Sequence, residues 1–479
     1  MKMLIKGEKR DAASKKVIEV RNMSDMSLID TVPEANWQDA QEALEAAVEG
    51  AKVWASMPVH KRVDILKRFA AQVRANREEL ARLLSAENGK TIGNARAEID
   101  TVAGLFEGFA EEASRLFGQT IPLEIQAGLE SDLMITKREP LGVIVGIIPF
   151  NFPAELFAHK AGAALAGGNA MIVKPPEDDP LTVIRLAEML HEAGVPGHVL
   201  QVVTGYGEEV GAYLANSPLV NAISFTGSTE TGTSVYQSGA KNLARVFLEL
   251  GANDALIVCE DGDVDAAVRH AIEGRLLANG QVCCTNKRIL VQQTVFDSFK
   301  HKLVQELAVK RLGNQLEEST DVGPLINESA AIKVEQQIQH TVEQGAKIIL
   351  GGKRVNGTFI EPTVLDGVTR EMDVAKDLEI FGPVFALLSF EQLDEAIAIT
   401  NQSNYGLNAG IFTSDIRKAF QAANAIETGI VSLNGGTCYR PYCSAFGGYK
   451  KSGIGREGTA YTLEEVTQIK SIVFRGVMA

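Results

Sequence analysis

Cysteine is scarce in this sequence of 479 residues, in which only five are present: Cys259, Cys283, Cys284, Cys438 and Cys443. The count is odd, and the spacing matches neither a disulfide framework nor a zinc site. We therefore expect a reducing compartment and no bound metal.

Long apolar runs and an excess of basic residues are also absent. Gly, Pro or a charge interrupts each apolar stretch well before the roughly 18 residues that a membrane helix requires, and the N-terminus lacks a secretory signal pattern. We therefore expect a soluble cytoplasmic protein without a membrane partner. Lys and Arg number 47 against 61 Asp and Glu, for a formal net charge of -14. This balance disfavours a nucleic-acid partner, because phosphate binding requires clustered cations, and it fits a small-molecule enzyme.

Local patterns divide the chain into segments. Asn36 can cap a helix that begins at Trp37, and residues up to about 118 look mainly helical because apolar side chains recur at helical spacing. Between 120 and 140, β-prone stretches on either side of Gly128 predict a hairpin of the kind that often serves assembly. The final apolar stretch, "TQIKSIVF", predicts a strand that pairs either with this hairpin or with another subunit.

From residue 141 onward, apolar runs alternate with amphipathic helical stretches. "LGVIVGII", "AMIVKP", "VLQVVTG" and "NAISFTGS" are typical of buried parallel strands. A second series, from about 251 to 450, includes "ALIVCE", "RILVQQT" and "FALLSF". Because the chain is also too long for one core, we predict two α/β domains.

Two glycine-containing loops after these strands are candidates for dinucleotide binding. In "VVTGYGEEVGAYL", Gly205, Gly207 and Gly211 lie between a strand and a helix, but their spacing is one residue longer than the Rossmann fingerprint and also fits an ordinary turn. In "FTGSTETG", Gly227 and Ser228 precede a helix whose free N–H groups could face a pyrophosphate.

A third candidate is the pair Lys174 and Glu177, which follow the strand "AMIV" at its carboxyl end. At that edge of a parallel sheet, an ammonium and a carboxylate could bind the two hydroxyls of an adenosine ribose. Taken alone, the pair also fits a solvated ion pair in a loop.

The stretch "NGQVCCTNKR" (residues 279–288) offers two candidate nucleophiles, Cys283 and Cys284. A thiol with the ordinary pKa of about 8.5 needs help to ionise, and many unpaired cysteines are simply small buried hydrophobes. Gly280 permits a tight turn after a helix predicted over 263–278, so both thiols leave regular structure where they could face a cleft. The local sequence does not choose between them.

Asn151 and Glu249 are candidate partners of a nucleophile. Asn151 in "FNFP" follows a strand, where its amide could donate to an oxyanion. Glu249 in "LELGAND" ends an apolar run, where partial desolvation would suit a general base. Each residue alone also fits a structural role, as a turn former or as a charge at the end of a strand.

Seven motifs, in order "FNFP", "KPPE", "FTGSTETG", "LELG", "GQVC", "EIFGPV" and "FGGYKKSGIGRE", closely resemble those of the NAD(P)-dependent aldehyde dehydrogenase superfamily. The resemblance covers nearly the whole chain. It implies an α/β fold with a Rossmann-like NAD-binding domain (1–119 and 140–250), an α/β catalytic domain (251–450) and a small β extension for oligomerisation (120–139 and 464–479). A homodimer or homotetramer is expected.

By this resemblance Cys283 is the catalytic nucleophile, and Cys284 is its neighbour in the pocket wall. Asn151 and the backbone N–H of Cys283 then hold the oxyanion, and Glu249 activates the water that hydrolyses the acyl-enzyme. The implied reaction passes from a thiohemiacetal, by hydride transfer to the nicotinamide, to a thioester and then to a carboxylate.

The resemblance also implies a cofactor site. Lys174 and Glu177 match the pair that binds the adenosine ribose, Ser228 the pyrophosphate contact, and Glu379 with Phe381 the contacts to the nicotinamide ribose and ring. The complete set expected at the cofactor is Ile148, Pro149, Phe150, Lys174, Glu177, Gly207, Gly211, Phe225, Gly227, Ser228, Leu250, Glu379 and Phe381. Because the Glu177 carboxylate would repel a 2′-phosphate, we expect NAD rather than NADP.

The expected lining of the aldehyde pocket is Phe152, Leu156, His159, Cys284 and Arg440. Arg440 could bind a carboxylate, phosphate or sulfonate, or it could form a salt bridge at the surface or between domains. His159 stands where several relatives that act on acidic semialdehydes have an arginine, so the pattern looks more like the lactaldehyde and non-phosphorylating glyceraldehyde-phosphate branches. We predict a short polar substrate, either a hydroxylated or an anionic aldehyde.

Other interpretations stay open at this stage. The chain could be a dehydrogenase for another class of semialdehyde, or a CoA-acylating enzyme, although such enzymes typically lack the general base that Glu249 supplies. A binding protein that has lost the chemistry is disfavoured by the joint presence of Cys283, Glu249 and Asn151. Oxidation of Cys283 to a sulfenic acid, or to a disulfide with Cys284, is a further hypothesis for inactivation.

Overall fold

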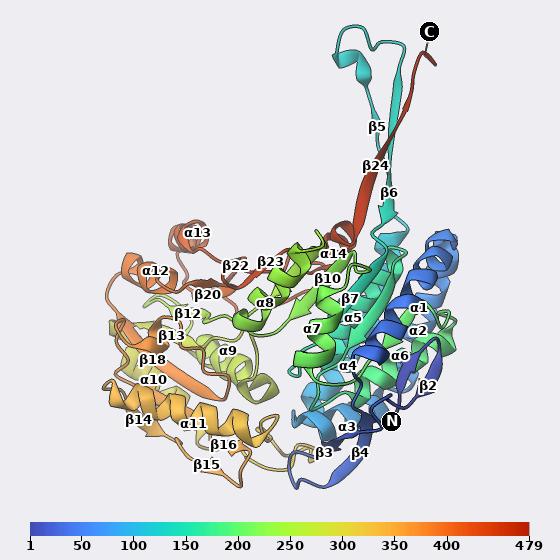
Figure 1. Ribbon diagram of the computed structural model, residues 1–479. Helices are drawn as coiled ribbons and strands as arrows, with labels where there is room; N and C mark the ends of the chain where they lie inside the picture. Colours follow the sequence, from blue (N-terminus) through green and yellow to red (C-terminus); the bar gives the residue numbers. More distant parts are fainter. Residues whose placement is uncertain (479) are drawn as a thin grey trace.

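Two sheets of mainly parallel strands organise the computed structural model, which describes residues 1–478 (Figure 1). In the first sheet, β7 to β11 run parallel, and antiparallel strands lie at both edges. Its strands, in spatial order, are β2 (Glu8–Arg10), β1 (Met3–Ile5), β9 (Leu200–Val202), β8 (Ala170–Lys174), β7 (Val143–Ile147), β10 (Ala222–Thr226), β11 (Arg245–Glu249) and β23 (Gly453–Ile454).

Helices cover both faces of this first sheet. One face packs against α1 (Trp37–Ser56), α7 (Ala212–Asn216) and α8 (Thr229–Ala240). The other packs against α5 (Pro153–Ala166) and α6 (Leu181–Ala193), and outside these lie α2 (Val59–Ala75), α3 (Arg77–Asn88), α4 (Ile92–Ala113) and α14 (Thr459–Glu465). The predicted start of α1 is confirmed, because the Asn36 side chain accepts from the Gln38 N–H at 2.9 Å and caps the helix.

The second sheet has seven strands, of which only the edge strand β14 runs antiparallel to its neighbour. In spatial order they are β14 (Lys347–Leu350), β17 (Thr363–Asp366), β18 (Val384–Phe390), β13 (Arg288–Gln292), β12 (Ala255–Val258), β20 (Asn408–Phe412) and β21 (Ile430–Leu433). One face packs against α9 (Val264–Leu276) and α10 (Gln293–Leu307), the other against α11 (Glu328–Glu343), α12 (Leu393–Asn401) and α13 (Ile416–Ala425).

Short elements complete the chain. Two-stranded pairs are β3 (Val17–Arg21) with β4 (Leu28–Pro33), β15 (Arg354–Val355) with β16 (Phe359–Ile360), and β19 (Tyr405–Gly406) with β22 (Tyr449–Lys450). Single helical turns span Leu123–Ile125, Gly207–Gly211, Leu277–Gly280 and Asp373–Ala375.

Burial explains the continuous apolar runs in the sequence. Every residue of β7, β8, β12 and β20 is buried, as expected for central parallel strands with helices on both faces. The predicted α/β class, with two sheet-centred bodies, is therefore confirmed. Among the helices of residues 1–478, none combines the length and the apolarity that crossing a membrane requires.

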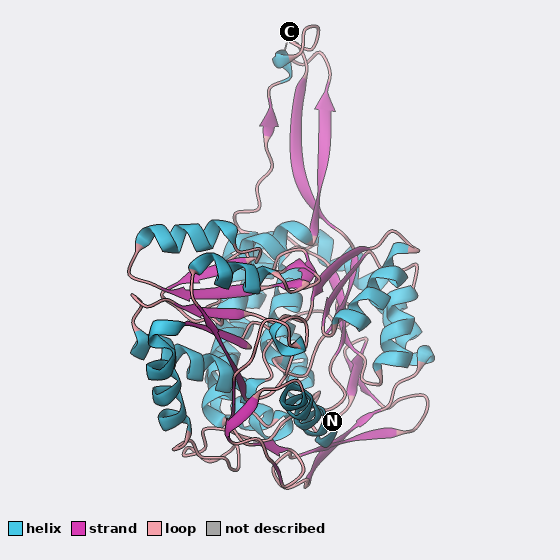
Figure 2. Ribbon diagram, turned by 90° about the vertical axis from the view of Figure 1, so that its left-hand side faces the viewer, coloured by secondary structure: helices cyan, strands magenta, loops and turns pink. Residues whose placement is uncertain are grey.

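A three-stranded arm projects from the first body (Figure 2). The predicted hairpin is present, but its first strand, β5 (Thr120–Ile121), is only two residues long and pairs with β6 (Leu133–Pro140). The main partner of β6 is the C-terminal strand β24 (Thr467–Phe474), which pairs with it along all eight residues. Of the two predicted partners for "TQIKSIVF", the hairpin is confirmed.

The carboxyl ends of β7, β8, β10 and β11 meet at one edge of the first sheet, where parallel α/β sheets bind their ligands. The segment after residue 450 returns to this sheet, because β23 pairs with β11 and α14 packs against α4 and α5. The end of β11 is thereby covered from both halves of the chain, and this is where the candidate site lies.

Candidate active site

A pocket of about 140 Å³ lies between the two bodies. All three predicted catalytic residues line it, so the fold brings together positions more than 130 residues apart. Its lining consists of Thr101, Asn151, Phe152, Glu155, Leu156, Thr226, Glu249, Leu277, Val282, Cys283, Cys284, Cys438, Arg440, Phe446 and Glu457.

The turn after α9 positions Cys283. Ala278, Asn279 and Gly280 all have positive φ angles, of 45°, 57° and 82°, a conformation that side chains other than glycine adopt at a cost. A Cβ on Gly280 would lie 2.2 Å from the carbonyl carbon of Gly382, so only glycine fits there. The Asn279 amide secures the turn by donating to the carbonyl oxygens of Gly89 and Pro324.

Cys283 is surrounded by other thiols. Hydrogen bonding with Cys284 and then burial raise the pKa of Cys283 well above its usual range. Cys284 also has a raised pKa: its bond with Cys283 lowers this pKa, but the Cys438 thiol and burial outweigh that effect. Both thiols therefore rest in the protonated form, and either one must lose its proton before it can act as a nucleophile.

Glu249 ends β11 and is a buried carboxylate in the lining of the same pocket. Burial, followed by the nearby Glu457, raises the pKa of Glu249 well above its usual range. Its Oε2 atom is buried and has no hydrogen-bond partner among the described residues. An unpartnered acceptor of raised basicity suits a group that takes a proton from a water molecule.

The peptide at Asn151 is held by a buried ion pair. Lys90 donates to the Asn151 carbonyl at 2.7 Å and to the Glu98 carboxylate, and both side chains are fully buried. Glu98 in turn accepts from the N–H groups of Ala154 and Glu155 at the start of α5. These contacts fix the backbone of Asn151 at the pocket wall, as an oxyanion donor requires.

Arg440 lines the pocket within a cluster of charges. Its Nη2 atom donates to Glu457 Oε2 at 2.5 Å and lies 3.1 Å from His159 Nε2. Its Nη1 atom lies 3.6 Å from Glu155 Oε1, and its guanidinium stacks 3.8 Å above the centre of the Phe446 ring. The salt bridge that was one expectation for Arg440 is therefore present, and it forms inside the pocket.

His159 lies behind Arg440 and is not part of the pocket lining. Burial and then Arg440 lower the pKa of His159, so its ring is neutral near pH 7. The side chains of the other predicted pocket residues, Phe152, Leu156 and Cys284, line the pocket directly.

A second buried cation, Lys160, connects the pocket to the end of β10. Lys160 Nζ donates to Thr226 Oγ1 at 2.7 Å and to Glu457 Oε1 at 3.1 Å. Burial alone would raise the pKa of Glu457, but the charges of Lys160 and Arg440 hold it well below its usual range. Glu457 is therefore ionised and shared by two cations.

The loops after β8 and β9 meet at Glu177. Lys174 Nζ donates to Glu177 Oε1 at 2.6 Å, and the Gly207 N–H donates to the same oxygen at 2.7 Å. The Lys174 side chain is only 3% exposed, which does not fit a solvated pair, and burial lowers its pKa. The Glu177 side chain is 33% exposed and remains accessible to a ligand.

The start of α8 lies at the same sheet edge. Ser228 caps this helix by accepting from the Thr231 N–H at 3.2 Å. The first-turn N–H groups have no carbonyl partner within the helix and favour an anion.

The helical turn from Gly207 to Gly211 leaves open space at its end, because a Cβ on Gly211 would meet no atom within 4 Å.

Glu379 and Phe381 come from the second body. Glu379 accepts from the Ala252 N–H at 3.2 Å and lies 3.1 Å from Lys287 Nζ, and Lys287 also donates to the Cys283 carbonyl. The Phe381 ring packs edge-on against Phe150, with centres 6.0 Å apart. Lys287 thus connects the Glu379 carboxylate to the backbone of Cys283.

The remaining predicted cofactor residues flank these groups. Ile148 donates through its N–H to the Lys174 carbonyl at 3.0 Å, and Leu250 donates to the Ser452 carbonyl at 2.9 Å. Pro149 follows Ile148 in the chain. Phe225 lies in β10, and the Phe225 ring fills the space that a Cβ on Gly227 would need. Three polar features therefore lie along this sheet edge: the Lys174–Glu177 pair, the N-terminus of α8 and the Glu379 carboxylate. Together they fit the hydroxyl and phosphate groups of a nicotinamide dinucleotide.

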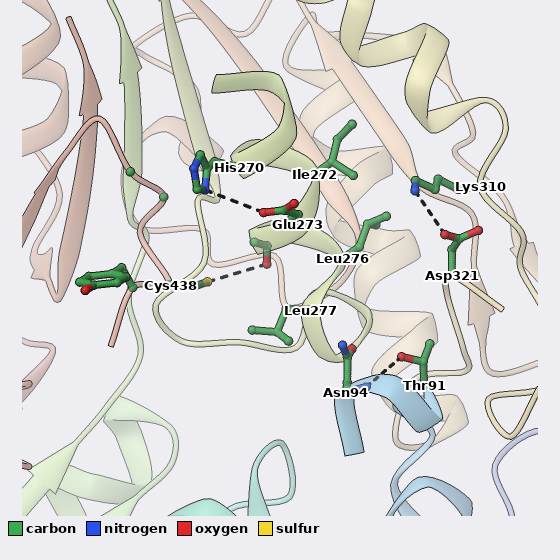
Figure 3. A pocket seen from close by; sticks show the side chains of 14 residues that line it. Thr91, Asn94, His270, Ile272, Glu273, Leu276, Leu277, Lys310, Asp321 and Cys438 are labelled. Atoms are coloured by element: carbon green, nitrogen blue, oxygen red, sulfur yellow. Dashed lines mark hydrogen bonds and ion pairs between the residues drawn. The ribbon is translucent and has the colours of Figure 1, made fainter. Parts of the chain in front are cut away.

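A larger cavity of about 530 Å³ adjoins the pocket, because Leu277 and Cys438 line both (Figure 3). His270 and Glu273 lie on one side of it, 3.9 Å apart, and Lys310 pairs with Asp321 on another at 3.2 Å. The two cavities therefore lie on either side of Leu277 and Cys438. No group of three or more His, Cys, Asp or Glu side chains within residues 1–478 is arranged to hold a metal ion.

Three charged residues in or just behind the pocket lining, Glu155, Glu457 and Lys160, were not predicted from the sequence. Glu155 was detectable, because it lies four residues before His159 and therefore on the same face of a helix. Glu457 ends a quoted motif, but only its contacts in the fold reveal that two cations share it.

The comparisons with known proteins agree with this geometry. Residues 9–472 match the aldehyde dehydrogenase family. A glutarate-semialdehyde dehydrogenase of Pseudomonas putida is 40% identical over 467 residues, covering 97% of this chain and 96% of the relative. A lactaldehyde dehydrogenase of Methanococcus vannielii is 35% identical over 464 residues, covering 96% of this chain and 97% of the relative.

Solved structures show the same fold. The crystal structure of an NADP-dependent enzyme of E. coli superimposes with a TM-score of 0.96 at 37% identity, covering 99% of this chain and 98% of that one. The predicted aldehyde dehydrogenase fold is therefore confirmed. The chain belongs to the aldehyde dehydrogenase family and is an enzyme that acts on aldehydes.

Proposed function

We propose that this enzyme oxidises a short polar aldehyde to its carboxylate with NAD, using Cys283 as nucleophile. The observation that carries the proposal is that Cys283, Glu249 and Asn151 line one pocket, which adjoins the loops that fit a dinucleotide. The names of relatives support the substrate class, because semialdehydes and lactaldehyde are short polar aldehydes.

In the first half of the reaction, Cys283 releases its proton to solvent, and its sulfur then attacks the aldehyde carbon. Asn151 and the backbone N–H of Cys283 donate to the oxygen, which becomes negatively charged in the thiohemiacetal. Bound NAD supplies the acceptor for the hydride whose loss from this adduct leaves a thioester.

In the second half, Glu249 takes a proton from a water molecule, and the resulting hydroxide attacks the thioester. The C–S bond breaks, the Cys283 sulfur takes up the proton held by Glu249 and is again a thiol, and the acid product gives its own proton to solvent and leaves as the carboxylate. The position of Glu249 in the same pocket as Cys283 supports hydrolysis rather than transfer to a thiol such as CoA.

Replacing Cys283 with Ala tests the proposal. We expect NADH formation from a panel of small aldehydes to fall about a thousandfold or more, because no other group forms the acyl-enzyme. NAD binding, measured by calorimetry, should stay within about twofold, because the ribose-binding loops are unchanged. Cys443→Ala is the matched control: this thiol is exposed in the nearby loop and should not be needed. Near-normal turnover by Cys283→Ala would contradict the proposal.

The cofactor preference is part of the same proposal. Glu177 holds a carboxylate beside Lys174 and is still partly accessible, so a 2′-phosphate placed there would meet a like charge. We expect NAD to be preferred over NADP.

The ratio of kcat/KM for NADP to that for NAD tests this preference. In Glu177→Gln, we expect the ratio to rise about tenfold or more, because the repulsion is removed and Lys174 is released to face the phosphate. Glu192→Gln, which removes an exposed carboxylate from α6, controls for a general effect of net charge. An unchanged ratio in Glu177→Gln would contradict the role of this residue.

We also propose that the enzyme works in the cytoplasm as a homodimer or homotetramer. The absence of paired cysteines supports a reducing compartment, and the exposed arm supports assembly.

A further inference from the structure

The guanidinium of Arg440 already pairs with two carboxylates of the pocket. Glu457 binds it at 2.5 Å and Glu155 faces it at 3.6 Å, from opposite parts of the chain. The Arg440 side chain is 13% exposed, and the two carboxylate side chains are 8% and 17% exposed. A buried arginine between two buried carboxylates has little charge left for an anionic ligand.

The charges around the pocket balance without a substrate. Among the described lining residues, Arg440 is the one cation, and Glu155, Glu249 and Glu457 are the acids. Lys160, just behind the lining, pairs with Glu457, and Arg440 faces Glu155. Burial raises the pKa of Glu249, which therefore keeps its proton to a higher pH, so two cations face two carboxylates. His159 packs against Arg440 as a neutral ring. A carboxylate or phosphate entering here would add an unpaired buried negative charge, which is strongly disfavoured.

Glu155 faces the side of the Arg440 guanidinium that Glu457 does not bind. Burial would raise the pKa of Glu155, but His159 and Arg440 hold it below its usual range, so it is ionised. Its Oε1 atom lies 3.6 Å from Arg440 Nη1, a distance that leaves an ion pair but no direct hydrogen bond. A hydroxyl group can bridge such a pair, because it accepts from a guanidinium and donates to a carboxylate at once.

We infer that Glu155 makes this pocket select aldehydes that carry a neutral hydroxyl group and reject aldehydes of similar size that carry an anionic group. The inference rests on the proposed aldehyde oxidation and names its substrate class. Glu155 acts as a specificity residue: its carboxylate receives the substrate hydroxyl and keeps Arg440 from binding an anion.

The test compares kcat/KM for glyceraldehyde, glyceraldehyde 3-phosphate and succinate semialdehyde, followed by NADH absorbance. We expect the wild-type enzyme to prefer glyceraldehyde by about tenfold or more over both anionic aldehydes. In Glu155→Gln, we expect kcat/KM for the anionic aldehydes to rise about tenfold and that for glyceraldehyde to fall, because Arg440 is released and an acceptor is lost. Glu192→Gln should leave the ratio unchanged.

A double variant shows whether Arg440 receives the anion. If it does, Glu155→Gln combined with Arg440→Gln loses the gain toward anionic aldehydes that the single variant shows. Retention of that gain in the double variant would overturn the proposed role of Arg440.

Two results would overturn the inference and leave the proposed function intact. One is a wild-type enzyme that prefers the anionic aldehydes, which needs no variant to fold. The other is a folded Glu155→Gln, checked by its melting temperature, with unchanged selectivity. Oxidation of none of the three aldehydes, or of any related short polar aldehyde, would instead overturn the proposed function and this inference with it.

Discussion

Glu249 illustrates how surroundings, rather than residue type, decide what a side chain does. A carboxylate in water is ionised near pH 7 and is a weak base, but burial beside Glu457 raises the pKa of Glu249 well above its usual range. The group therefore keeps its proton to a higher pH, and its ionised form is a stronger base when it appears. The position of Glu249 at the end of an apolar run predicted its partial desolvation, but not the neighbouring Glu457.

The raised pKa gives a prediction for pH dependence. The base form of Glu249 increases as pH rises through its raised pKa, so hydrolysis of the acyl-enzyme should speed up over that range and slow below it. In Glu249→Gln, this pH dependence should disappear, and steady-state turnover should fall about a hundredfold or more while a first-turnover burst of NADH persists. Stopped-flow absorbance measures both phases. Loss of the burst together with turnover would instead indicate that Glu249 is essential for the first half of the reaction.

The contacts of Arg440 depend on the fold rather than on the sequence around it. From the sequence, its guanidinium could equally bind an anionic substrate or form a salt bridge. The distances to Glu457 and Glu155 show that the salt bridge is made, because α5 and the segment after β23 carry both acids to the same place. No spacing in the sequence relates residues 155, 440 and 457.

At the scale of elements, β24 is an edge strand with one unpaired side. It pairs with β6 on one side, and the sheet order β24-β6-β5 leaves its other edge without a partner strand among residues 1–478. Ile469 and Val473 project from one face and are 63% and 52% exposed. Long edge strands with exposed apolar side chains are usually covered by another chain.

We therefore expect Ile469→Asp to weaken self-association. A charge on the apolar face of β24 would have to be buried between copies, which is costly, so the mass measured by light scattering after gel filtration should fall by half or more. Gln468→Asp adds the same charge to the opposite face of the strand and serves as control. If the mass of Ile469→Asp matched that of the unmodified chain, this face of β24 would not be the contact between copies.

At the scale of the whole molecule, the active site belongs to neither sheet alone. Cys283 leaves α9 of the second body, whereas Asn151 and Glu249 follow strands of the first. The turn at Ala278, Asn279 and Gly280 joins the two, since Asn279 bonds to Gly89 in the first body and to Pro324 in the second. Strain in this turn is thus supported from both sides.

The sequence by itself determined the α/β class, the cap of α1 and the hairpin, and it indicated candidate catalytic residues. These follow from local rules, such as the burial of parallel strands on both faces and the capping preference of Asn36. Its motifs also indicated the family. Only the tertiary structure decided that β24 pairs with β6, that His159 lies behind the pocket, and that Glu155 and Glu457 share Arg440. The physical reason is that pairing and charge balance depend on which distant segments meet, and no local pattern encodes that distance.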